Sequence, residues 1–88
     1  MQRVSSHPMG RLLGYVDIKV ASRVYKLPIE AAPLEQGEDS TAKPGFFSQG
    51  ANTLGILVDS NAPDGEQRAT IERASVDAER FISRKFLN

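Results

Sequence analysis

The clearest pattern in the chain is an alternation of apolar and polar positions near its N-terminus. In GYVDIKV, residues 14–20, β-branched residues at 16, 18 and 20 alternate with side chains that carry polar groups. A second run of the same period, RVYKLPI, spans residues 23–29. A period of two places successive side chains on opposite faces of a strand, so both runs are predicted strands with one buried face.

The two predicted strands are separated by Ala21 and Ser22, which predicts a β-hairpin with a two-residue turn. Tight hairpin turns favour residues that accept a positive φ, such as Asn-Gly, so this turn leaves room for a shifted register. Pro28 has no N–H to donate to a neighbouring strand. We therefore expect the second strand to lie at an edge, or to end, near Pro28.

Residues 30–52 carry two prolines, three glycines and a cluster of acidic side chains, which predicts a long acidic loop. Phe46 and Phe47 stand side by side in it, although the chain has only four phenylalanines. The run TLGILVD, residues 53–59, is apolar on both faces and predicts the most buried strand.

The C-terminal part of the chain predicts an amphipathic helix over about residues 65–86, with Asp64 as its N-cap and Gln67 completing a capping box. Apolar residues recur there at spacings of three and four. They are Ile71, Ala74, Ala78, Phe81, Ile82 and Phe86. The expected fold is α+β, with the order β-β-long loop-β-α: a small three-stranded antiparallel sheet and one long C-terminal helix packed on one face. Residues 1–10 are predicted to be a flexible tail, and residues 11–88 a single domain.

A chain of 88 residues buries a marginal core, and without cysteine it has neither disulfides nor thiolate metal sites to support one. Self-association is the remaining common means of support, so a homo-oligomer is predicted. No apolar segment resembles a signal peptide or a membrane span. The expectation is therefore a cytoplasmic protein without a membrane partner.

The predicted helix, about 33 Å long, exceeds strands of about 23 Å, and its largest apolar side chains come late. Two arrangements follow. Either the long loop folds back so that Phe46 or Phe47 packs beside Phe81 and Phe86, or the end of the helix meets a second chain or a different partner. We expect one phenylalanine of the loop to fill the core and the other to be available for contact. The predicted protein-contact residues are Phe46, Phe47, Phe81, Ile82 and Phe86.

No motif in the chain predicts catalysis, a cofactor or a metal ion. His7 is the only histidine and lies in the predicted tail, and there is no cysteine nucleophile. Residues 59–70 do not fit a calcium-binding loop, because Pro63, Asp64 and Thr70 occupy its fifth, sixth and twelfth positions. The glycine spacing matches no phosphate-binding loop. The prediction is a non-enzymatic protein with no cofactor.

The net charge is zero but unevenly distributed. Residues 1–29 carry five basic and one acidic side chain (+4), residues 30–66 one basic and seven acidic (−6), and residues 67–88 five basic and three acidic (+2). This asymmetry suits contact with another protein or with a second copy of the chain. The main functional hypothesis is a homodimeric protein-binding or regulatory module. The alternative is a nucleic-acid-binding regulator that uses the basic hairpin through Arg11, Lys19, Arg23 and Lys26.

Overall fold

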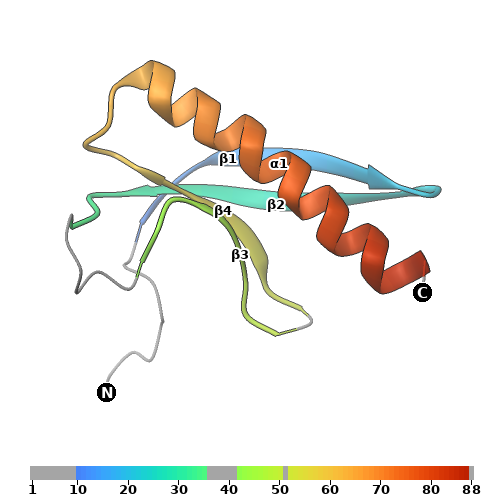
Figure 1. The fold of residues 1–88 in the computed structure, drawn as a ribbon. Coiled ribbons are helices and arrows are strands. Elements are labelled where there is room, and N and C mark those ends of the chain that lie inside the picture. The colour runs from blue at the N-terminus through green and yellow to red at the C-terminus, as the bar shows by residue number, and fades with distance from the viewer. Residues whose placement is uncertain (1–9, 36–41, 51, 88) are drawn as a thin grey trace.

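The computed structural model describes residues 10–35, 42–50 and 52–87, which form a sheet covered on one face by a helix (Figure 1). The predicted α+β class is therefore confirmed. Within these ranges the sheet has four strands, in the order β1-β2-β4-β3. The elements are β1 (Arg11–Val20), β2 (Arg23–Ala32), β3 (Gly45–Ser48), β4 (Leu54–Asp59) and α1 (Asp64–Leu87). The predicted tail, apart from Gly10, lies outside the described residues, as does His7.

β1 and β2 form the predicted antiparallel hairpin, with Val20 opposite Arg23 and Ile18 opposite Tyr25. The turn has Ala21 at φ 58°, in the left-handed region that a residue with a Cβ rarely adopts. Neither alternative expected at Pro28 holds for the strand as a whole, because β2 continues to Ala32 and lies between β1 and β4 in the sheet. Pro28 instead precedes the first residue of β2 that pairs with β4, so its missing N–H interrupts no ladder between these two strands.

The prediction of three antiparallel strands is wrong in two respects. Residues 45–48, expected within the long loop, form a short strand that pairs antiparallel with β4, and the Gln49 N–H donates to the Thr53 carbonyl (2.8 Å) across the turn. β4 lies between β2 and β3 and runs parallel to β2. A four-residue strand is too short to show an alternating pattern. Gly45 begins β3 and Gly50 follows it in the turn to β4, with φ of 135° and 85°. These glycines contributed to the prediction of a loop, although they flank a strand.

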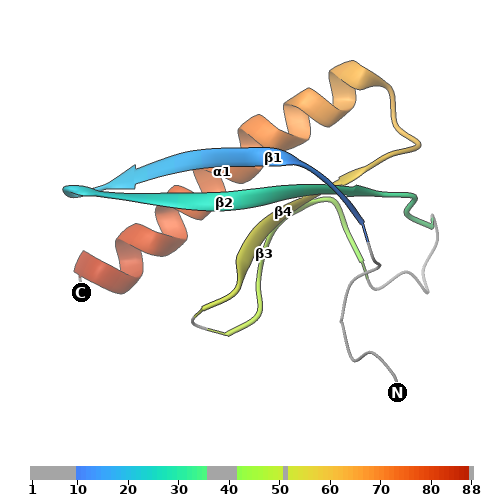
Figure 2. The same cartoon turned by 180° about the vertical axis from the view of Figure 1, so that it is seen from behind.

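α1 crosses one face of the sheet diagonally, which fits a long helix over short strands (Figures 1 and 2). Its predicted stripe is buried at Ala74, Ala78 and Ile82. Ala74 packs with Ile56 and Val58 of β4, while Ala78 and Ile82 pack with the hairpin of β1 and β2. The two alanines let the helix backbone approach the sheet closely, so the helix stripe is largely used within the chain.

The sheet face opposite the helix is only partly covered. At its β4 side, Leu57 is buried together with Ala32 and Leu34, beneath Phe47. Over the hairpin the same face is open, and the side chains of Tyr15 and Val24 are more than half exposed. The protein therefore has one complete core and a smaller cluster behind it.

The helix begins one residue earlier than the predicted capping box implies. Asp64 is already helical, and the first acceptor is the Pro63 carbonyl, which receives the Gln67 N–H at 3.0 Å. The Gln67 side chain donates to the Ala62 carbonyl (2.8 Å) instead of to Asp64. Asp64 and Glu66 are thus acidic side chains within the first turn, where their negative charges interact favourably with the helix dipole. Among the described residues, no helix is long and apolar enough to cross a membrane.

Candidate functional site

A groove of about 780 Å³ lies beside the described residues at the C-terminal half of α1. Its walls come from β2, from the start of β4 and from the helix. The lining residues are Tyr25, Lys26, Leu27, Pro28, Asn52, Thr53, Leu54, Phe81, Ile82 and Lys85. The volume lies in the range of roughly 300–1,000 Å³ that ligand sites usually occupy. We refer to it as the helix-end groove.

The groove exists because β2 and β4 are neighbours over only part of their lengths. Their register runs from Ile29 opposite Ile56 to Ala32 opposite Asp59. The pairing does not extend to Lys26, Leu27 or Pro28, and the groove lies between these three residues and residues 52–54. Figure 2 shows β4 and β3 running away from β2 on the side of the sheet where the C-terminal end of α1 lies.

The floor of the groove is apolar. Leu27 and Ile82 are buried core residues, and Tyr25, Leu54 and Phe81 pack against them with part of their surfaces exposed. A partner that covered the exposed part would gain roughly 25 cal/mol for each Å² of apolar surface removed from water. The floor is thus an extension of the core that the chain itself leaves partly open.

The rim of the groove is basic. Among the described residues, its lining contains Lys26 and Lys85 and no acidic side chain. The Lys26 ammonium donates to an Asp17 carboxylate oxygen at 3.1 Å, but both side chains are more than half exposed. The Lys85 ammonium stands 5.5 Å from the centre of the Phe81 ring, a cation–π distance. The groove therefore offers two exposed cations beside an apolar floor.

The structure places the predicted contact residues at different sites. Phe46 packs beside Phe81, with ring centroids 5.4 Å apart and planes tilted by 54°. This matches the arrangement in which a phenylalanine of residues 30–52 fills the gap beside the helix. Phe47 points to the opposite face of the sheet, above Gly55. Phe81 and Ile82 line the groove, and Phe86 lies in α1, where the structure describes only its backbone.

The four cations of the nucleic-acid hypothesis are divided between the two faces of the hairpin. Arg11 and Arg23 stand opposite Ala31 and Val20, which face the helix. Lys19 and Lys26 stand opposite Val24 and Asp17, which belong to the other face. The eight residue steps from Arg11 to Lys19 also span about 27 Å of strand. This spacing does not gather the four charges into one patch.

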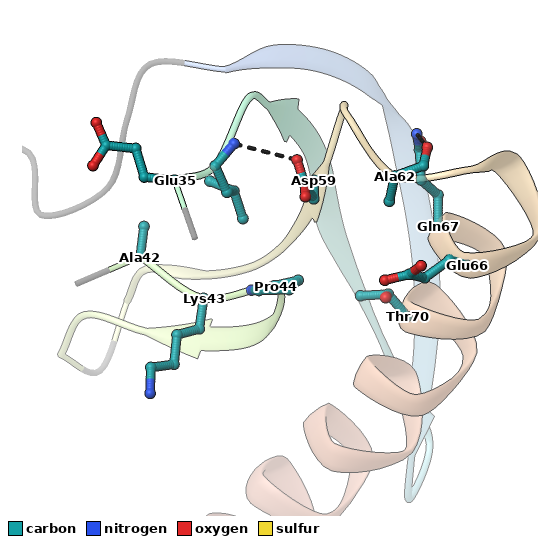
Figure 3. Close-up of a pocket in the computed structure, with 10 residues that line it drawn as sticks. Glu35, Ala42, Lys43, Pro44, Asp59, Ala62, Glu66, Gln67 and Thr70 are labelled. Carbon is teal, nitrogen blue, oxygen red and sulfur yellow. Dashed lines mark hydrogen bonds between the residues drawn. The ribbon is translucent and has the colours of Figure 1, made fainter. Parts of the chain in front are cut away.

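A smaller hollow of about 260 Å³ lies at the other end of the helix, beside the end of β4 (Figure 3). Asp59, only 9% exposed, accepts the N–H of Leu34 (3.2 Å) and that of Asn61 (2.9 Å) through one carboxylate oxygen. Glu35 and Glu66 also line this hollow. No group of three metal-ligating side chains gathers among the described residues. Asp59 thus links the two loops that contain Leu34 and Asn61, and we call this link the joint at Asp59. Its role is structural.

Comparisons with protein-family models, with curated proteins and with solved structures found no significant match. The candidate site therefore depends on its geometry alone. Sequence reasoning found Phe81 and Ile82 through the helix period but missed Tyr25, Leu54 and Lys85. Pro28 held the available signal, because a proline inside a strand implies an edge that is unpaired at that position.

Proposed function

We propose that this protein is a small non-enzymatic binding module, and that the helix-end groove holds an apolar segment of another protein that also carries acidic groups. The observation that carries the proposal is the combination of a partly open apolar floor at Tyr25, Leu54 and Phe81 with a rim that, among the described residues, contains lysines and no acid. Aromatic and aliphatic anchors in a desolvated pocket contribute most of the free energy of a typical protein interface. Rim charges contribute mainly to selectivity and to the rate of association.

Selection of peptides on the immobilised chain tests this function. Random twelve-residue peptides displayed on phage are selected, and the affinity of the strongest is measured by fluorescence anisotropy. Lys85→Glu should weaken binding about threefold to tenfold, because it replaces an attraction of about 0.2–1 kcal/mol with a repulsion. Arg84→Glu is the matched control, since Arg84 directly precedes Lys85 in the chain and is also exposed, but does not line the groove.

The predicted homodimer is a second part of the proposal, and β1 supports it better than the helix stripe does. Among the described residues, no strand pairs with the outer edge of β1, and Leu12, Leu13 and Tyr15 are exposed there. An antiparallel pairing of two β1 strands about Ile18 would set Asp17 opposite Lys19 of a second copy. Opposite charges in directly facing positions stabilise such a pair.

Light scattering behind size exclusion tests the homodimer independently of the groove. A dimer has twice the 9.6 kDa of the chain. Lys19→Asp would place two carboxylates opposite each other and should shift the mass toward the monomer. The double variant Asp17→Lys with Lys19→Asp restores opposite charges and should recover the dimer. A monomeric wild-type chain at high concentration would exclude this part of the proposal.

A further inference from the structure

We infer that the occupant of the helix-end groove is an extended peptide segment that joins β2 as an additional strand. This inference rests on the proposed function and specifies its partner. The partner would bind through main-chain hydrogen bonds to β2, and its apolar and acidic side chains would contact the floor and the lysines of the groove. Addition of a strand to an unpaired sheet edge is a recurring mode of peptide recognition.

The backbone of β2 is oriented for such a partner. In an antiparallel hairpin with a two-residue turn, the residues that flank the turn form a hydrogen-bonded pair, and successive pairs then alternate. Val20 and Arg23 flank this turn, so the pairs Lys19–Val24 and Asp17–Lys26 are of the other kind. The main-chain N–H and C=O groups of Val24 and Lys26 consequently point away from β1, toward the groove side.

Pro28 agrees with this alternation. It pairs with Tyr15 two residues beyond Lys26, so it belongs to the same set, and its nitrogen also faces away from β1. A proline is tolerated there because the pairing of β2 with β4 begins only at the next residue, Ile29. An added strand thus has hydrogen-bond partners at Val24 and Lys26 and meets its natural end at Pro28, where β4 begins to occupy the edge.

The side chains of the groove suit alternate residues of an extended segment. Side chains on one face of that segment would lie against the exposed parts of Tyr25 and Phe81, and those on the other face would point away from the helix. Lys26 belongs to that second face and pairs with the exposed Asp17, whereas Lys85 stands beside Phe81 on the helix side. No acidic residue is among the described residues that line the groove. Apolar residues alternating with Asp or Glu are therefore the expected sequence of the partner.

Other occupants would use the same floor but not the same backbone. A helical peptide has its own main-chain groups satisfied internally, and a fatty carboxylate has none to offer. Both could pair with the lysines through a carboxylate and cover the apolar floor. Hydrogen bonding to Val24 and Lys26 is consequently the property that separates an added strand from these alternatives.

The test uses the strongest peptide selected from the random twelve-residue library and two N-methylated versions of it. One version is methylated at odd positions and the other at even positions, so each blocks hydrogen bonding along one edge of the strand. One version should bind at least tenfold more weakly than the parent, and the other within about threefold. Amide hydrogen exchange of the full chain should slow at Val24 and Lys26 when the parent peptide is bound.

The outcomes separate this inference from the proposed function. If both methylated versions bind like the parent, while Lys85→Glu still weakens binding, the occupant is not a strand but the groove remains a peptide site. If no peptide is selected whose binding responds to Lys85→Glu, the proposed function fails, and the inference fails with it. Sodium decanoate, tested alone, would overturn both if it protects groove amides and no peptide competes with it.

Discussion

The Phe47 ring lies directly over Gly55 on the neighbouring strand, where a Cβ built on the glycine would come within 2.7 Å of the ring. Phe47 and Gly55 are opposite each other in the pairing of β3 with β4. The absence of a side chain at Gly55 therefore leaves the space that the aromatic ring occupies.

Gly55→Ala should therefore destabilise the protein, because the Phe47 ring must move away from Leu57 and the small cluster that it covers. We expect a loss of about 1–3 kcal/mol in the free energy of unfolding, measured by urea denaturation. Gly65→Ala is the matched control: its Cβ meets nothing within 4 Å, and in the first helical turn it should stabilise by about 0.5 kcal/mol. Equal effects of the two substitutions would contradict the packing of Phe47.

Phe46 and Phe81 should be energetically coupled. A double-mutant cycle with Phe46→Ala and Phe81→Ala is expected to give an interaction free energy of about 0.5–1.5 kcal/mol, because the rings meet at 5.4 Å in a tilted geometry. The control cycle pairs Phe47→Ala with Phe81→Ala. Those two rings lie on opposite faces of the sheet, so their effects should add, and coupling in that cycle would show that the substitutions act through general loosening.

These contacts show where the sequence was informative. The helix and the hairpin could be predicted because each repeats its pattern over several turns or pairs. Their buried sides are indeed Ala74, Ala78 and Ile82 on the helix and Ile18 and Val20 on the hairpin. A long pattern of this kind reflects the burial that forms the core.

The remaining fold and the groove depend on contacts between distant segments, which no local pattern records. β3 is four residues long, and its pairing depends on where the turn at Gln49–Thr53 places it beside β4. The groove depends on where β4 leaves β2, which is a property of two strands separated by more than twenty residues. Local periodicity identifies which faces are buried but not which strands become neighbours.

The hairpin turn contains a residue whose replacement by a better turn former should raise the stability of the protein. Ala21 has φ 58°, a conformation that costs a residue with a Cβ about 1–2 kcal/mol. Ala21→Gly should therefore stabilise the protein by about 0.5–1 kcal/mol, because glycine removes this cost but loses more chain entropy on folding. Thermal and urea unfolding both measure the change. Ser22→Gly is the control: Ser22 has no positive φ, so its substitution should destabilise slightly, and a gain there would point to another cause.

Asp59 should be the most sensitive polar residue in the described part of the chain. Asp59→Ala removes the acceptor of the Leu34 and Asn61 N–H groups, and leaving such groups unpaired costs about 1–3 kcal/mol. Asp59→Asn retains one carbonyl oxygen in the same place. Both N–H groups use only that single oxygen, so the asparagine variant should keep most of the stability.

Urea denaturation of the two Asp59 variants measures this difference, and the groove provides an independent check of its cause. The joint at Asp59 and the helix-end groove lie at opposite ends of α1, so Asp59→Asn should leave the affinity for the selected peptide unchanged. A weakened affinity in a variant that keeps its stability would mean that the two ends of the helix are coupled. That outcome would contradict a purely structural role for Asp59, because a local joint acts on the groove only by unfolding the domain that forms it.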